Sequence, residues 1–157
     1  EGVLKYISNI KPAAIILGST SSYPLSKEQW INGTSRVLNI VSSPDTKTYI
    51  IAGTPILGFD GPACIEKLES SKHDATSSQC SKPIATDLFQ NVSSYLQEAA
   101  KKSPETQVVD LNNFVCPESV CHARQDNGIF VFRDSQHLTD TFVQSISGDV
   151  AKLFEPR

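Results

Sequence analysis

The sequence predicts an α/β fold: a three-layer α/β/α sandwich in which helices flank a mainly parallel sheet. Short, continuous apolar runs recur along the chain, which is typical of strands buried on both faces of such a sheet. Longer segments with apolar residues three to four positions apart lie between these runs, so the connections are expected to be right-handed helical crossovers. At 157 residues the chain is long enough for one compact domain with its own core.

Three apolar runs are expected to form the parallel strands: AAIIL at 13–17, TYIIAG at 48–53 and QVVDL at 107–111. A fourth segment, IFVFR at 129–133, follows a glycine and predicts a short hairpin or an edge strand. Reactive groups in parallel sheets gather beyond the carboxyl ends of the strands. A functional site is therefore expected in the polar segments that follow the three runs.

Three segments carry helical periodicity, at 26–41, 84–102 and 139–154. The first opens with Ser26 and Gln29 at the spacing of a capping box, in which each side chain bonds the backbone amide of the other residue. The second has the most regular apolar stripe, and the third repeats that pattern near the end of the chain. No internal repeat or linker divides the chain, so a single domain is expected.

The four cysteines fall as two sequence-local pairs, Cys64 with Cys80 and Cys116 with Cys121. The first pair lies within 54–83, which is expected to be a long irregular insertion. Four cysteines permit three connectivities, and local pairing is favoured because each loop is short and self-contained. Closing the first loop would stabilise the fold by about 3 kcal/mol. Disulfides imply an oxidising compartment; four reduced thiols are the alternative.

Neither a nucleic-acid partner nor a cofactor is predicted. The net charge of −3 argues against a general nucleic-acid binder, and the longest apolar run is far too short to span a bilayer. In CPESVCH four residues separate the cysteines, whereas haem attachment uses two, and a zinc site needs more ligands than His73 and His122 add. No metal is therefore predicted. Because the chain contains no methionine, it is expected to be a mature chain, an excised domain or a fragment.

The segment FRDSQHLTD, at 132–140, places an aspartate and a histidine together before the last predicted helix. With Asp134 three positions before His137, both side chains can project the same way. The carboxylate can then receive the Nδ1 proton of the imidazole and leave Nε2 free as a base, as in a catalytic triad. The alternative is a surface aspartate with a capping role beside a partly exposed histidine.

The C-terminal block DLNNFVCPESVCHARQDNGIFVFRDSQHLTDTF resembles that of SGNH-type hydrolases. More narrowly, it resembles the extracytoplasmic SGNH domains fused to membrane acyltransferases of the acyltransferase-3 family. Those domains share a strand ending in Val-Asp, a local cysteine pair, a glycine, a short aromatic strand and Asp-x-x-His-Leu-Ser/Thr. The residues in register are Asp110, Cys116, Cys121, Gly128, Phe132, Asp134, His137, Leu138 and Thr139. KPAAIILGSTSSYP and YIIAGTPILGFDGPACI are similar to earlier strands of the family, so the resemblance covers nearly the whole chain.

The resemblance implies an SGNH, flavodoxin-like fold and makes residues 1–157 the C-terminal portion of a single SGNH-like domain, incomplete at the N-terminus. It also implies that Asp134 and His137 are catalytic. The family's nucleophile lies in a Gly-Asp-Ser turn, which does not occur in this chain, so the serine is expected in a preceding part of the domain. Ser19 and Ser21 stand where the family supplies oxyanion or substrate contacts, and Ser19 is also a rival nucleophile. A plain Ser/Thr-rich turn is the structural alternative.

The activity that the resemblance implies is O-acyl transfer, in particular acetyl transfer, to a cell-envelope carbohydrate such as lipopolysaccharide O-antigen. An upstream membrane acyltransferase domain would supply the acyl donor, and a carbohydrate hydroxyl would accept the group. The expected location is the periplasm, as part of an inner-membrane protein, and the fragment alone is expected to be inactive. Two alternatives are a carbohydrate O-acyl esterase with the same residues and a non-catalytic glycan-binding or structural module.

Overall fold

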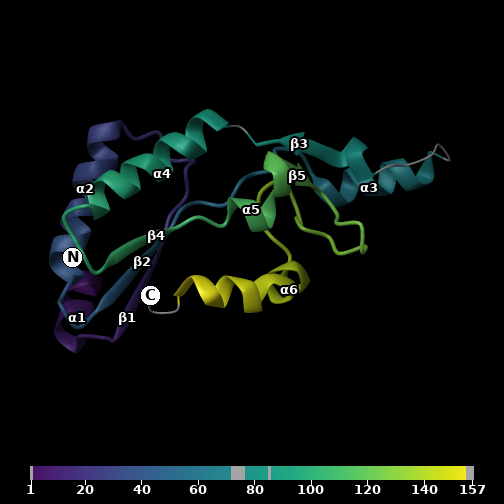
Figure 1. The fold of residues 1–157 in the computed structure, drawn as a ribbon. Coiled ribbons are helices and arrows are strands. Elements are labelled where there is room, and N and C mark those ends of the chain that lie inside the picture. The colour runs from purple at the N-terminus through teal and green to yellow at the C-terminus, as the bar shows by residue number, and fades with distance from the viewer. Residues whose placement is uncertain (1, 72–76, 85, 155–157) are drawn as a thin grey trace. The chain divides into compact units, whose positions relative to one another are not determined.

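The computed structural model describes residues 2–71, 77–84 and 86–154. Over these residues the chain divides into two compact units. The first comprises residues 2–53 and 86–110, and the second comprises residues 54–71, 77–84 and 111–154. Figure 1 labels the helices and strands of both units. None of the helices in the described part of the chain is long and apolar enough to cross a membrane.

The first unit contains a parallel sheet with the strand order β1-β2-β4. Its strands are β1 (Ala14–Gly18), β2 (Lys47–Ile51) and β4 (Thr106–Val109). The register places Leu17, Ile50 and Val108 side by side across the sheet. All three pack in one hydrophobic cluster, with Ile50 of the central strand almost fully buried. The strands form where the three apolar runs predict them, with ends that differ by a residue or two.

Two helices, α2 (Lys27–Val41) and α4 (Thr86–Ala100), cover the face of the sheet that carries this cluster (Figure 1). α2 contributes Trp30 and Leu38 to the cluster, and α4 contributes Val92 and Leu96. The two helices also contact each other. The apolar stripes that predicted these helices are therefore the surfaces that they bury.

The start of α2 shows the predicted capping box. The N–H of Gln29 donates to Oγ of Ser26 at 3.2 Å, and the N–H of Ser26 donates to Oε1 of Gln29 at 2.8 Å. Before β1 lies a helix that was not predicted, α1 (Gly2–Ile10), which contacts α2. None of its residues is buried, although Val3 and Tyr6 are apolar.

The second unit is built around the cysteines. Its elements are α3 (Gly61–Ser70), η1 (Ser77–Cys80), β3 (Ser81–Pro83), α5 (Asn112–Val115), η2 (Pro117–Ser119), β5 (Val120–His122), α6 (Asp140–Ala151) and η3 (Lys152–Phe154). β3 and β5 pair in an antiparallel ladder. The core includes Leu57, Ile65, Phe132 and Phe142 together with buried cysteines. Disulfides join Cys64 to Cys80 and Cys116 to Cys121, which is the sequence-local pairing.

The predicted fold class, α/β with a parallel sheet flanked by helices, is confirmed. The prediction of an irregular insertion at 54–83 is wrong, because α3 forms within it. Its start is marked by Asp60, whose Oδ1 accepts the N–H of Ala63 at 2.9 Å, and by a proline in the first turn. Segment 129–133 does not form an edge strand. Its pairing consists of isolated antiparallel bridges, as in a short hairpin.

Candidate active site

The predicted Asp–His pair lies at the tip of a hairpin in the second unit. Phe132 and Leu138 form an antiparallel bridge at its base. Next to this bridge, the N–H of Thr139 donates to the carbonyl oxygen of Val131 at 3.0 Å. Phe132 is fully buried in the hydrophobic core, so the base of the hairpin is fixed, whereas the side chains of Asp134 and His137 in the turn are exposed to solvent.

Asp134 and His137 are hydrogen-bonded to each other in the turn. Nδ1 of His137 lies 2.8 Å from Oδ2 of Asp134. The other carboxylate oxygen, Oδ1, accepts the backbone N–H groups of Gln136 and His137, both at 2.8 Å. The N–H of Arg133 closes the turn by donating to the carbonyl oxygen of His137 at 2.9 Å. The spacing of three residues therefore brings the carboxylate and the imidazole together.

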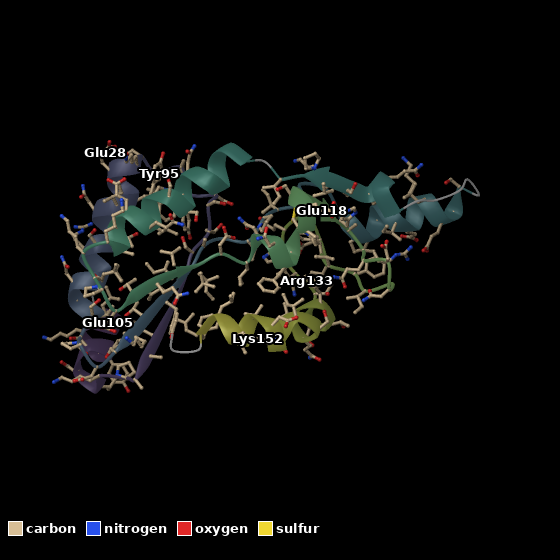
Figure 2. The ribbon with its side chains drawn as sticks, viewed as in Figure 1. Glu28, Tyr95, Glu105, Glu118, Arg133 and Lys152 are labelled. Carbon is tan, nitrogen blue, oxygen red and sulfur yellow. A yellow bond between two sulfur atoms is a disulfide. The ribbon has the colours of Figure 1, made fainter. Side chains whose placement is uncertain are left out.

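The environment of Asp134 strongly favours its ionised form. The backbone N–H of His137, then that of Gln136, then the imidazole lower the pKa of Asp134 from 3.8 to about 2. Nε of Arg133 (labelled in Figure 2) lies 3.7 Å from Oδ2, but this side chain is 65% exposed, so solvent screens the pair. Asp134 is consequently a stable negative charge beside the imidazole at neutral pH.

This arrangement is suited to general-base catalysis by the imidazole. Because the carboxylate accepts from Nδ1, the favoured neutral tautomer carries its proton there and has a free lone pair on Nε2. The His137 side chain is 55% exposed, so it is open to an approaching hydroxyl group. The negative charge of Asp134 also stabilises the imidazolium that forms after proton uptake. The pair can therefore supply the acid and base of a triad, and needs a nucleophile from elsewhere.

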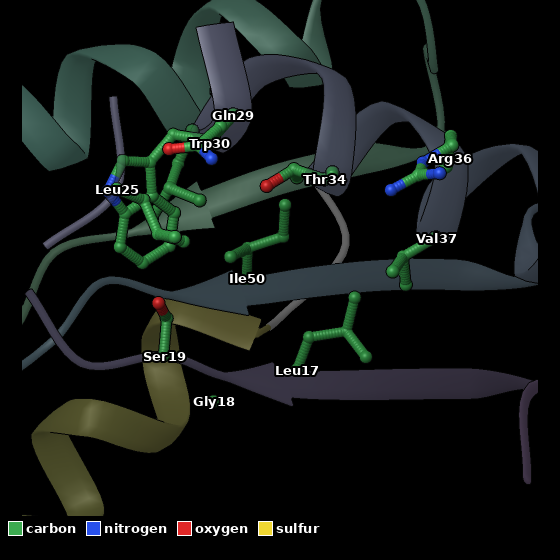
Figure 3. A pocket seen from close by; sticks show the side chains of 12 residues that line it. Leu17, Gly18, Ser19, Leu25, Gln29, Trp30, Thr34, Arg36, Val37 and Ile50 are labelled. Carbon is green, nitrogen blue, oxygen red and sulfur yellow. The ribbon is translucent and has the colours of Figure 1, made fainter. Parts of the chain in front are cut away.

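Ser19 and Ser21, the predicted oxyanion or substrate residues, belong to the first unit and follow β1. Ser19 lines a mainly apolar cavity of about 510 Å³ (Figure 3). In Figure 3 it lies beyond the end of β1, on the side of the cavity where Leu25 and Trp30 lie. The described lining includes neither a histidine nor a carboxylate, so this cavity offers no base that could activate Ser19.

Ser21 is buried, and its surroundings explain why. A Cβ added to Gly53, two residues after β2, would lie 2.8 Å from the backbone nitrogen of Ser21. The turn after β1 therefore packs directly on the backbone after β2, and Gly53 makes the close approach possible. The structure shows a packing role for Ser21, and its role at an oxyanion stays a prediction.

Metal ligation finds no support in the described part of the chain. No group of three or more His, Cys, Asp or Glu side chains there could hold a metal ion. Both cysteines of CPESVCH are in a disulfide, and none of the four cysteines is free. His122 ends β5, whereas His73 lies outside the described residues.

Thr139 has a structural role that the sequence pattern did not assign. Its Oγ1 accepts the N–H of Phe142 at 3.1 Å and so caps α6, while its hydroxyl donates to the carbonyl oxygen of Phe130. One side chain thus joins the hairpin of the Asp–His pair to the following helix. The sequence does contain a signal for this cap: Thr139 comes directly before Asp140, the acidic first residue of α6.

Two comparisons with known proteins concern the fold, one with curated proteins and one with solved structures. A comparison with curated proteins found no match. Among solved structures, the chain is similar to the periplasmic domain of a lipopolysaccharide acetyltransferase from Salmonella ser. Paratyphi A, with 18% identity and a TM-score of 0.68. The alignment covers 96% of this chain but only 61% of the Salmonella domain. At this identity the likeness establishes the fold.

The family assignment comes from a match over almost the whole chain. Residues 3–152 match the family described as the SGNH domain fused to AT3 domains. The matched region contains all of the hairpin with Asp134 and His137 and both disulfides. The resemblance inferred from the sequence is thereby confirmed: the chain belongs to the family of SGNH domains that are fused to AT3 domains.

Proposed function

We propose that the chain is the C-terminal portion of an SGNH domain that transfers an acyl group, specifically acetyl, to a hydroxyl of a cell-envelope carbohydrate such as lipopolysaccharide O-antigen. The observation that carries this proposal is the 2.8 Å contact between Nδ1 of His137 and Oδ2 of Asp134 in an exposed turn. Membership of the SGNH family supports the reaction class. The similar Salmonella domain is described as part of an acetyltransferase.

The nucleophilic serine is proposed to come from an N-terminal part of the same domain. Among the described residues β1 pairs with β2 on one side, so its other edge is open to a further strand. Ile16 of β1 is 59% exposed, which is unusual for an apolar side chain in the middle of a strand. The chain spans 61% of the Salmonella domain, which is consistent with further elements of the sheet outside this sequence.

The proposed reaction has two half-reactions that use the same base. The serine oxygen attacks the acyl carbonyl while Nε2 of His137 takes the hydroxyl proton, and this proton then passes to the leaving group of the donor. A carbohydrate hydroxyl next attacks the acyl-serine ester and gives its proton to Nε2, which returns a proton to the departing serine oxygen. Asp134, ionised because its pKa is about 2, stabilises the imidazolium in both halves.

The acyl donor is proposed to come from an upstream membrane acyltransferase domain, since the family is one of SGNH domains fused to AT3 domains. The proposed location is the periplasm, as part of an inner-membrane protein. Two disulfides support an oxidising compartment. The partners of the chain are then the acyl donor, the carbohydrate acceptor and the N-terminal part of the SGNH domain.

The test compares the full parent protein with its His137→Ala variant. Acyl transfer to a glycan acceptor and labelling by a serine-directed phosphonate are both measured, and both should be lost in the variant. His122→Ala, which removes a histidine outside the pair, is the matched control and should keep both. Labelling at full rate in His137→Ala would contradict the triad and favour a non-catalytic module. Ester cleavage that is equally fast with and without glycan would assign an esterase.

A further inference from the structure

The turn that holds Asp134 and His137 is tied to a distant segment by one backbone hydrogen bond. The N–H of Gly58 donates to the carbonyl oxygen of Ser135 at 2.9 Å. The other hydrogen bonds recorded for the described turn are internal to the hairpin. We propose that Gly58 is a positioning residue, whose N–H fixes the peptide that orients Asp134 against His137. This inference rests on the acyl transfer proposed above.

A single peptide group transmits the contact. The carbonyl of the peptide between Ser135 and Gln136 accepts from Gly58, and the N–H of the same peptide donates to Oδ1 of Asp134 at 2.8 Å. Because a peptide group is planar and rigid, rotation at one end moves the other. Displacement of the carbonyl would therefore weaken the bond that orients the carboxylate. The 2.8 Å contact between Asp134 and His137 depends on that orientation.

The backbone conformation at position 58 favours glycine. The φ angle of Gly58 is +80°, in the left-handed region that L side chains rarely adopt. A Cβ at this position would also lie 2.9 Å from Nζ of Lys82. Nζ is the end of a flexible, exposed side chain that can move aside, so the strain comes from the φ angle. This strain would move the backbone away from the conformation that donates to Ser135.

The donor sits on a segment that is fixed on both sides. Leu57, directly before Gly58, is fully buried in the same cluster as Phe132 at the base of the hairpin. Asp60, shortly after Gly58, caps α3 by accepting the N–H of Ala63 at 2.9 Å. The hydrogen bond of Gly58 therefore connects the exposed turn to a well-anchored part of the core.

Gly128 provides a matched control in the same unit. Its φ angle is +87°, and a Cβ there would meet nothing within 4 Å. Its N–H donates to the carbonyl oxygen of Gln125 at 2.9 Å, away from the turn. Gly58→Ala and Gly128→Ala therefore impose similar left-handed strain, but only Gly58→Ala disturbs the peptide at Ser135.

The test measures kcat and KM for acyl transfer by the full parent protein, together with the Tm of each variant. Gly58→Ala should lower kcat roughly tenfold or more and leave KM within about twofold, because a misplaced base impairs the chemical step rather than binding. Gly128→Ala should keep kcat while losing a comparable amount of thermal stability. Equal kcat values in the two folded variants would overturn the proposal.

A second pair of variants decides the question if Gly58→Ala does not fold. Asparagine lessens the strain of the left-handed region without removing it, so Gly58→Asn and Gly128→Asn repeat the comparison under milder strain. Gly58→Asn should therefore have a reduced kcat, whereas Gly128→Asn should keep its kcat. No difference between these two variants would overturn the proposal. Activity that persists in His137→Ala would instead overturn the proposed function, whereas activity that needs His137 but not Gly58 would overturn this inference alone.

Discussion

Replacing Asp134 by asparagine should abolish the activity and leave the fold intact. Oδ1 of Asp134 accepts two backbone N–H groups at 2.8 Å, and the asparagine oxygen can accept both. The asparagine NH2 group then takes the place of Oδ2, 2.8 Å from Nδ1 of His137. Since an amide NH2 only donates, Nδ1 must accept, and the imidazole proton moves to Nε2.

The expected loss follows from this change of tautomer. A protonated Nε2 cannot take the proton of a serine or carbohydrate hydroxyl, and the neutral amide no longer stabilises the imidazolium. Together these effects should lower kcat by roughly 10⁴-fold, as expected when the carboxylate of a triad is replaced by an amide. The backbone hydrogen bonds of the turn persist, so the far-ultraviolet circular dichroism spectrum should not change.

The assay is the rate of acyl transfer by the parent protein at saturating acyl donor and glycan. Asp140→Asn is the matched control, because it makes the same charge change at an exposed residue, whose Oδ2 accepts from Nε2 of Gln144 at 2.8 Å. This variant should keep nearly full activity. A loss below tenfold in Asp134→Asn, or an equal loss in the control, would refute the role assigned to the carboxylate.

Replacing Cys64 and Cys80 by serine should destabilise the domain by about 3 kcal/mol, and replacing Cys116 and Cys121 by about 2 kcal/mol, because the cost grows with loop length over separations of 16 and 5 residues. Urea unfolding measures both, and the reverse order would contradict the loop-entropy account. The lowered pKa of Asp134 means that the unfolded state binds its proton more readily. The stabilisation is therefore complete above the unfolded pKa of 3.8 and is lost as pH falls towards 2. Asp134→Asn should flatten the dependence of unfolding free energy on pH in this range, and an unchanged slope would count against the hydrogen-bonded carboxylate.

Local patterns predicted the first unit well. The apolar runs that became β1 and β2 are continuous, as is typical of strands in a parallel sheet. β2 is mostly buried as expected, whereas only Ile15 of β1 is buried. The capping box of Ser26 and Gln29 formed because both of its bonds join residues within one helical turn. The pattern failed at 54–83, where α3 has a weak apolar stripe and buries only Gly61 and Ile65.

The candidate site was predictable in part, because the contact between its carboxylate and its imidazole is local in the sequence. Asp134 and His137 are three residues apart, so a single tight turn brings them together without help from the rest of the chain. The Gly58 contact could not be predicted, because nothing in the sequence says that this glycine lies beside Ser135. The glycine itself was visible, but a glycine in a loop is compatible with many turns.

By itself the sequence determined what depends on near neighbours: the strand and helix segments of the sheet unit, the cap of α2 and the approach of an aspartate to a histidine. Only the tertiary structure decided which distant segments meet, among them Leu57 with the core around Phe132 and Gly58 with Ser135. The physical reason is that short-range hydrogen bonds and periodicity need only the residues involved. Long-range contacts are selected by the packing of a whole core, and the same local pattern is compatible with many such packings.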